Sequence, residues 1–216
     1  MAAYGRQPLR NLFDDSPTPH IAHPPRTHRR QYYLATDGSF RESGGGLGVV
    51  IETAGGERVG RLSIPDRAPD NNVAEYRALH LGLDVLAARA SADTRVGVLV
   101  DHDDLAANVN TATLRARQPD WPGHAPSIPS GSRFHWRGIR ARINGFAELR
   151  AARIASGENP AHPLANAPGR YRHINGHGDT NAEDDGTEKP HLPPAPFDGD
   201  RREVPPPSRA DRHASD

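Results

Sequence analysis

The chain has 216 residues, 35% of them hydrophobic, and its 27 basic and 27 acidic side chains cancel to a formal net charge of zero. This apolar share, with 21 glycines, excludes a wholly disordered chain, and the total charge shows neither a strongly basic nucleic-acid binder nor an acidic shell. The absence of cysteine excludes disulfides, thiolate zinc sites and cysteine nucleophiles. We find no apolar run of 18 residues and no secretory h-region in the first 30 residues, and we therefore expect a cytoplasmic protein with no membrane partner.

The two ends of the chain differ in composition from its middle. Residues 1–30 are basic and residues 168–216 are acidic; both are rich in proline and neither shows hydrophobic periodicity. Such segments cannot bury enough apolar surface to offset the chain entropy lost on folding. We predict a disordered basic arm over 1–30, a folded domain over 31–167 and a disordered acidic tail over 168–216, and we expect residues 29–169 to fold without the two ends.

The middle of the chain opens with three predicted strands. Alternating or continuous apolar residues mark them over 31–37, 47–53 and 57–64. Gly38 and Ser39 predict the turn that ends the first strand, and residues 54–57 predict the next turn. Consecutive strands with short turns favour an antiparallel meander.

After residue 70 the hydrophobic period becomes helical. Leucines at three- and four-residue spacing predict an amphipathic helix over 71–88, which Asp70 or Asn71 can cap. Residues 95–101 predict a strand that is buried on both faces. The remaining elements are helices over 103–109 and 136–146, a strand over 148–154, and a short helix opened by Asn159 and Pro160. The order β-β-β-α-β-α-α-β-α indicates an α/β fold, a mixed sheet with helices packed on it.

Three acidic residues occupy positions that a sheet would bring together. Asp37 ends the first strand, Asp101 ends the strand that follows the helix, and Glu75 lies in the first turn of that helix. The carboxyl ends of strands gather reactive groups at one sheet edge, and converging carboxylates are relieved most simply by a hard divalent cation such as Mg²⁺ or Mn²⁺. Taken singly, each acid is more typical of a turn or a cap, so the metal interpretation depends on all three.

The ordered set of motifs resembles type-1 ribonuclease H. The matching segments are DGS at 37–39, GGGLGVVI at 44–51, NNVAE at 71–75, VLVD at 98–101, and NPAHPLAN at 159–166, which is similar to the family pattern Asn-x-x-Ala-Asp-x-Leu-Ala. The resemblance covers residues 31–167. It implies a ribonuclease H-like fold, in which three antiparallel strands and then parallel strands form a five-stranded mixed sheet flanked by helices.

The resemblance also implies a set of metal ligands, with one departure. Asp37, Glu75 and Asp101 match the family's acids, whereas His162 stands where the family normally has aspartate. Archaeal-type members, particularly those of halophiles, are the subgroup in which we expect this histidine. On this interpretation the four residues form the catalytic site and bind two Mg²⁺ or Mn²⁺ ions. The alternative is that His162 is a surface helix residue and that the site is degraded.

The family's substrate is RNA paired with DNA. The resemblance implies an endonuclease that hydrolyses the RNA strand by a two-metal-ion mechanism, leaving 5′-phosphate and 3′-hydroxyl ends. Gly38, Ser39, Asn71 and Asn72 are the expected substrate contacts, because short amides can bond 2′-hydroxyls in the minor groove. The two asparagines can also simply cap a helix, and glycines 44–46 either let nucleic acid approach or form a hairpin turn.

Two other functions compete with this one, and both keep the same fold. A non-catalytic module that binds nucleic acid or protein would fit the missing fourth aspartate and the long ends. Another nuclease of this fold, for instance one that cuts double-stranded RNA, is the further option. If the protein is a nuclease of either kind, we expect it to be a monomer.

Overall fold

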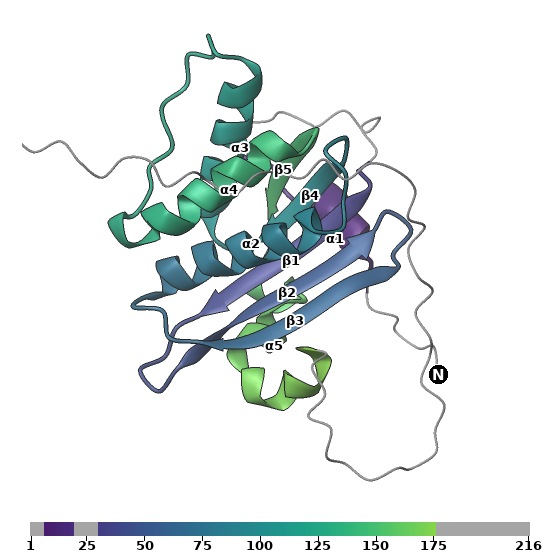
Figure 1. The fold of residues 1–216 in the computed structure, drawn as a ribbon, viewed down its shortest axis with the longest axis vertical. Helices are drawn as coiled ribbons and strands as arrows, with labels where there is room; N and C mark the ends of the chain where they lie inside the picture. Colours follow the sequence, from purple (N-terminus) through teal and green to yellow (C-terminus); the bar gives the residue numbers. More distant parts are fainter. Residues whose placement is uncertain (1–6, 20–29, 176–216) are drawn as a thin grey trace, which may run out of the picture. The chain divides into compact units, whose positions relative to one another are not determined.

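The computed structural model describes residues 7–19 and 30–175, all of which belong to a unit that spans residues 1–178. Five strands form one sheet in the order β3-β2-β1-β4-β5 (Figure 1). Their bounds are β1 Tyr32–Ser39, β2 Gly45–Thr53, β3 Arg58–Asp66, β4 Arg95–Val100 and β5 Glu148–Arg153. The first three strands pair antiparallel, whereas β4 and β5 run parallel to β1 and to each other. The predicted mixed sheet is confirmed.

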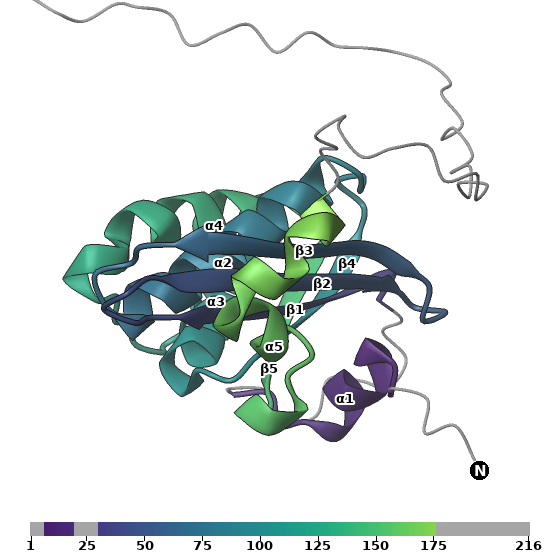
Figure 2. The same cartoon turned by 90° about the horizontal axis from the view of Figure 1, so that it is seen from below.

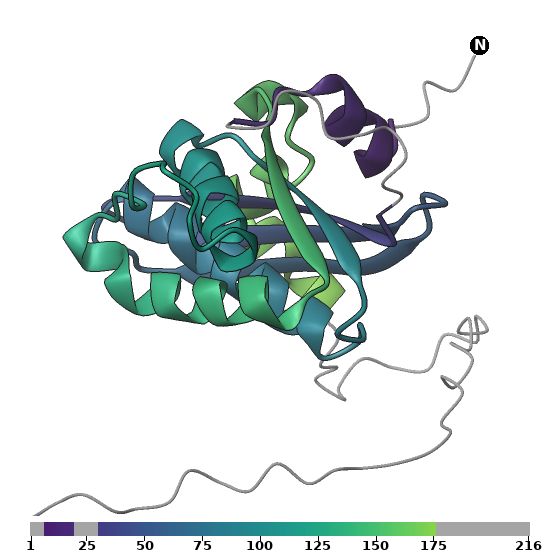
Figure 3. The same cartoon turned by 90° about the horizontal axis from the view of Figure 1, so that it is seen from above.

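Helices cover both faces of this sheet (Figures 2 and 3). One face carries α2 (Asn71–Ala87), α3 (Asp103–Arg117) and α4 (Arg133–Gly145), and the other carries α1 (Leu9–Asp15) and α5 (His162–Asn166). Short 3-10 turns stand at η1 (Ser130–Ser132), η2 (Ser156–Glu158) and η3 (Pro168–Asn175). The leucines that predicted α2 are buried against the sheet, as their spacing requires. Within the described residues, no helix is both long and apolar enough to cross a bilayer.

The predicted turn at Gly38 and Ser39 is wrong. Both residues continue β1, where they pair with Leu47 and Gly46, and the chain turns only afterwards, at 40–44, where Gly44 has φ +106°. Gly38 is needed for a different reason: a Cβ there would overlap the backbone of Ala74 in α2. The glycine therefore lets a helix approach the strand and does not form the turn.

The third helix is longer than its sequence indicates. It was predicted over 103–109 but continues to Arg117. Polar residues on its inner side interrupt the apolar period, yet they are buried: the Asn110 side chain donates to the carbonyl of Ala151 in β5 and accepts from its N–H, both at 2.8 Å. These bonds satisfy a buried amide and bind α3 to the sheet edge.

The predicted disordered arm over 1–30 does not hold for residues 7–19. Leu9 and Phe13, one helical turn apart in α1, are buried to within 1% of full burial, and the Phe13 ring packs edge-on against Tyr33. The backbone is held at both ends of the segment: Leu9 N–H donates to the Glu52 carboxylate, and the Pro17 carbonyl accepts from Arg153 N–H. Two apolar side chains are too few to give a recognisable hydrophobic periodicity in the sequence, but they are enough to bury one side of α1. The rest of the arm lies outside the described residues.

The domain also extends past the predicted boundary at 167. Residues 168–175 form η3, which lies beside β3, and the Arg61 guanidinium stands 5.1 Å from the centre of the Tyr171 ring. The expected acidic tail therefore does not begin at residue 168. Its remainder, residues 176–216, lies outside the described residues.

Candidate functional site

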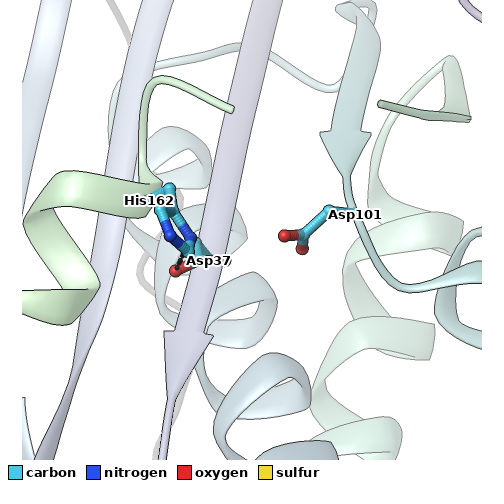
Figure 4. Close-up of side chains that lie close together, drawn as sticks. All are labelled: Asp37, Asp101 and His162. Carbon is cyan, nitrogen blue, oxygen red and sulfur yellow. Dashed lines mark ion pairs between the residues drawn. The ribbon is translucent and has the colours of Figure 1, made fainter. Parts of the chain in front are cut away.

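The ends of two neighbouring parallel strands bring two carboxylates together. Ala35 of β1 pairs with Leu99 of β4, so Asp37 and Asp101, each two residues further on, come level at one edge of the sheet. His162 joins them from the first turn of α5. One ligand atom from each of these three side chains lies within 4.8 Å of the other two (Figure 4).

His162 faces Asp37 directly, with its Nδ1 3.4 Å from Asp37 Oδ2. The segment that delivers it is tied to β1 by Asn159, whose Nδ2 donates to the Thr36 carbonyl and whose Oδ1 accepts from Ala161 N–H. The position of Asn159 in the sequence predicted that it caps a helix starting at Pro160. It does not, because α5 begins only at His162. Its side chain instead positions that helix start beside Asp37.

Glu75 approaches the same place from α2. It is 3% exposed, and one of its carboxylate oxygens accepts a hydrogen bond from the N–H of Gly38, the residue after Asp37. It does not belong to the group of three whose ligand atoms lie within 4.8 Å. Its charge nevertheless interacts with those of Asp37 and Asp101, so the structure brings all four predicted residues into one neighbourhood.

Burial and mutual repulsion oppose ionisation of these acids. Burial, followed by the charge of Asp101, raises the pKa of Asp37 to about 7, although His162 acts in the opposite direction. Burial, followed by the charges of Asp37 and Asp101, raises the pKa of Glu75 to about 9. Like charges in a desolvated site have this effect unless a cation neutralises them.

Two of the expected substrate contacts are occupied within the protein. Gly38 packs against the backbone of α2. The Ser39 hydroxyl donates to the Ala165 carbonyl of α5 at 2.7 Å and accepts from Gly46 N–H at 3.0 Å. The structure thus gives both residues a role in joining elements, and contact with a substrate through them stays a prediction.

The other two expected contacts, Asn71 and Asn72, are exposed at the start of α2. Neither caps the helix, because the Asp70 carboxylate does so by accepting from Val73 N–H at 2.8 Å. Asn72 instead bonds to His102, which follows Asp101 in the chain; its Oδ1 lies 2.7 Å from the histidine Nε2. No pattern in the sequence indicates this contact of His102.

Glycines in β2 provide the contact surface for α5. A Cβ on Gly46 would come within 2.6 Å of the Ala165 carbonyl oxygen, and one on Gly48 would overlap the Ala161 carbonyl oxygen. The glycine run 44–46 by itself predicted a hairpin turn or a nucleic-acid contact. The alternation of Gly46 and Gly48 on one strand face was the available sign that a backbone packs there.

Comparison with known proteins gives matches in structure alone. No family model matches the sequence, and a search of curated proteins found no match. The ribonuclease H domain of PFV is 17% identical with a TM-score of 0.51, and the match covers 68% of this chain and 99% of that domain. The foamy viral protease-reverse transcriptase, solved with an RNA/DNA hybrid, is 16% identical with a TM-score of 0.51, over 73% of this chain and 23% of that one.

This protein has the ribonuclease H fold. The ribonuclease H1 of the halophilic archaeon Halobacterium salinarum NRC-1 is 21% identical, with a TM-score of 0.46 over 66% of this chain and 98% of that one. The sheet order and the two matches with a TM-score of 0.51 confirm the fold expected from the sequence motifs.

The residues at the edge of this ribonuclease H fold suit a hard divalent cation. The buried oxygens Glu75 Oε2 and Asp101 Oδ1 accept no hydrogen bond from any described residue, and Asp37 Oδ2 faces His162 Nδ1 at 3.4 Å. Buried anionic oxygens without donors require a proton or a cation. Three carboxylates and one imidazole are an accepted donor set for Mn²⁺, and the carboxylates alone suit Mg²⁺.

Proposed function

We propose that this protein is a ribonuclease H, a metal-dependent endonuclease that hydrolyses the RNA strand of RNA–DNA hybrids. The observation that carries the proposal is the convergence of Asp37, Glu75, Asp101 and His162 at one edge of a ribonuclease H fold, where one buried oxygen each of Glu75 and Asp101 has no hydrogen-bond partner among the described residues. The foamy viral protease-reverse transcriptase, of which the match covers 23%, was solved with an RNA/DNA hybrid, which supports this class of substrate.

The positions of the four residues indicate which metal ion each of them would bind. Asp37 lies close to both Asp101 and His162, so it would help to hold both of two Mg²⁺ or Mn²⁺ ions, with Glu75 and Asp101 at one and His162 at the other. Bound ions would lower the pKa of a water molecule and stabilise the charge that develops on the phosphate. The side chains themselves form no covalent bond to the substrate, and the products carry 5′-phosphate and 3′-hydroxyl ends.

The substrate would lie across the exposed start of α2. Asn71 and Asn72 stand there within one helical turn of Glu75, so amides that can bond 2′-hydroxyls border the carboxylates. This neighbourhood supports recognition of an RNA strand at the place where its phosphate would be attacked.

A cleavage assay with the full chain tests the proposal. An end-labelled hybrid, the matching double-stranded RNA and the matching duplex DNA are each incubated with Mg²⁺, with Mn²⁺ or with a chelator. We expect metal-dependent cleavage of the RNA in the hybrid, with 5′-phosphate ends, and a loss of at least about a thousandfold in Asp37→Asn, because a ligand common to both ions is removed. Circular dichroism of Asp37→Asn checks that its fold is retained.

Three outcomes would contradict parts of this assignment. Cleavage of double-stranded RNA in preference to the hybrid would change the substrate. Wild-type cleavage rates in Asp37→Asn would show that Asp37 is not part of the active site. Hybrid binding without cleavage under either metal would favour a non-catalytic binding module, the alternative that the histidine at position 162 raises.

A further inference from the structure

His102 has one defined tautomer in this structure. Its Nδ1 accepts a hydrogen bond from the backbone N–H of Leu105 at 3.2 Å, which makes it the N-cap of α3. A backbone N–H can only donate, so Nδ1 must carry a lone pair. In a neutral imidazole the proton then resides on the other nitrogen, Nε2.

The same tautomer determines which way the Asn72 amide points. Since His102 Nε2 donates, the amide atom that lies 2.7 Å away must be an acceptor, which is the oxygen Oδ1. The Asn72 NH₂ group therefore points away from His102, and no hydrogen bond from the described residues engages it. An asparagine side chain that would otherwise rotate freely presents two N–H donors to its surroundings.

The His102 ring is itself held from a further side. Tyr76, which is fully buried in α2, meets the ring edge-on at 6.4 Å between ring centres. The Tyr76 hydroxyl accepts from Asn108 Nδ2 of α3 at 2.9 Å, which holds the phenol in place. The ring thus rests on two helices and on the end of β4, and its orientation does not depend on Asn72.

We propose that His102 is a positioning residue that presents Asn72 to the RNA–DNA hybrid as a hydrogen-bond donor only. This inference rests on the proposed function. Asn72 and Glu75 are three residues apart and share a face of α2, so the amide borders the carboxylates. In the minor groove every base pair offers acceptors, and the RNA strand adds its 2′-hydroxyl oxygens.

A donor-only amide matches these groups whatever the base sequence. A freely rotating amide would direct its oxygen toward the same acceptors for part of the time and would be repelled. His102 thereby favours hybrid binding without base specificity, and it acts through Asn72, not through the metal ligands.

The test is a double-mutant cycle on the full-length protein. His102→Ser keeps a good helix cap, but its side chain is too short to reach Asn72. We expect it to raise the KM for a hybrid about five- to tenfold, the effect of one hydrogen bond, and to leave kcat within about twofold. Asn72→Ala should raise KM in the wild-type background but by less than about twofold in the His102→Ser background, because the two residues act as one unit.

The cycle separates this role from simple helix capping, because capping alone would give no coupling between the two residues, and two further measurements accompany it. His124→Ser makes the same exchange at an exposed loop histidine and should match the wild type. A two-bond ¹H–¹⁵N spectrum of the wild-type protein without substrate should place the His102 proton on Nε2. Additive effects of the two substitutions, or a proton on Nδ1, would overturn the inference.

The outcomes also distinguish this inference from the function on which it rests. If the wild type cleaves the hybrid while His102→Ser keeps the wild-type KM, the positioning role is wrong and the proposed function stands. If the wild type neither binds nor cleaves the hybrid, both are overturned.

Discussion

Asp37 in β1 lies directly opposite Gly48 in β2 in the antiparallel pairing of the two strands. Opposite residues in such a pair direct their side chains to the same face, so the space that Gly48 leaves lies next to the Asp37 carboxylate. The backbone of α5 occupies this space: a Cβ on Gly48 would overlap the Ala161 carbonyl oxygen and lie 2.9 Å from the Ala165 nitrogen. His162 reaches Asp37 because this position has no side chain.

The first prediction concerns that glycine. Gly48→Ala should displace α5 and destabilise the protein by about 1–3 kcal/mol, the usual cost of overpacking a tight contact. Thermal unfolding should show a fall of several degrees, at about 2–4 °C per kcal/mol for a chain of this size. Gly145→Ala is the matched control, because a Cβ there meets nothing within 4 Å, and it should not lower the melting temperature. Equal melting temperatures for Gly48→Ala and the wild type would show that α5 does not depend on this contact.

A second prediction follows from the raised pKa values of about 7 for Asp37 and about 9 for Glu75. Carboxyl groups in an unfolded chain titrate near pH 4, so between about pH 4 and pH 9 the folded protein binds more protons than the unfolded chain. The free energy of unfolding of the metal-free protein should therefore fall as pH rises through this window. Melting curves in a chelator at about pH 5 and about pH 8 measure this slope.

Divalent cations should reverse this effect, because they compete with protons for the same oxygens. Mg²⁺ or Mn²⁺ at about ten times its dissociation constant should stabilise the folded state by about 1.4 kcal/mol, and the gain should be larger at about pH 8 than at about pH 5. Asp37→Asn should reduce both the pH slope and the response to metal. A melting temperature that does not respond to either ion at any pH would argue against a metal site.

A third prediction concerns the helix at the N-terminus. Phe13 is 1% exposed and packs against Tyr33, so Phe13→Ala should cost about 3–5 kcal/mol of stability. Asn11→Ala, on the exposed side of the same helix, should change stability by less than about 0.5 kcal/mol. Urea unfolding of both variants provides the measurement. The expectation that residues 29–169 fold without the two ends stays a prediction, but these contacts indicate that such a fragment is less stable. Deletion of residues 1–19 should destabilise the domain at least as much as Phe13→Ala.

The last prediction concerns the histidine at the place of the fourth acid. An imidazole nitrogen suits Mn²⁺ better than Mg²⁺, so hybrid cleavage should be faster with Mn²⁺. His162→Asp should retain activity and lower the ratio of the Mn²⁺ rate to the Mg²⁺ rate, whereas His162→Ala should lose at least about tenfold with both ions. His124→Ala is the control. If His162→Ala matches the wild type with both metals, His162 takes no part in metal binding.

Local patterns in the sequence were sufficient for the framework of the fold. The strands, the long helix α2 and the positions of Asp37, Glu75 and Asp101 could be predicted, because periods of 2.0 and 3.6 residues and the residues at element ends are properties of short segments. The order of these elements along the chain also indicated a mixed sheet, and the motif resemblance indicated its topology.

What the sequence did not reveal depends on contacts between distant segments. Leu9 bonds to Glu52, 43 residues away, and Ser39 bonds to Ala165, 126 residues away, and no local pattern records either pairing. Gly38 was interpreted as a turn residue because a glycine that admits a neighbouring backbone looks the same in a sequence as one that turns the chain. Likewise, the tautomer of His102 and the direction of the Asn72 amide are decided only when the end of β4 meets the start of α2. Each side chain can both donate and accept a hydrogen bond, and only contact with its partner determines which of the two it does.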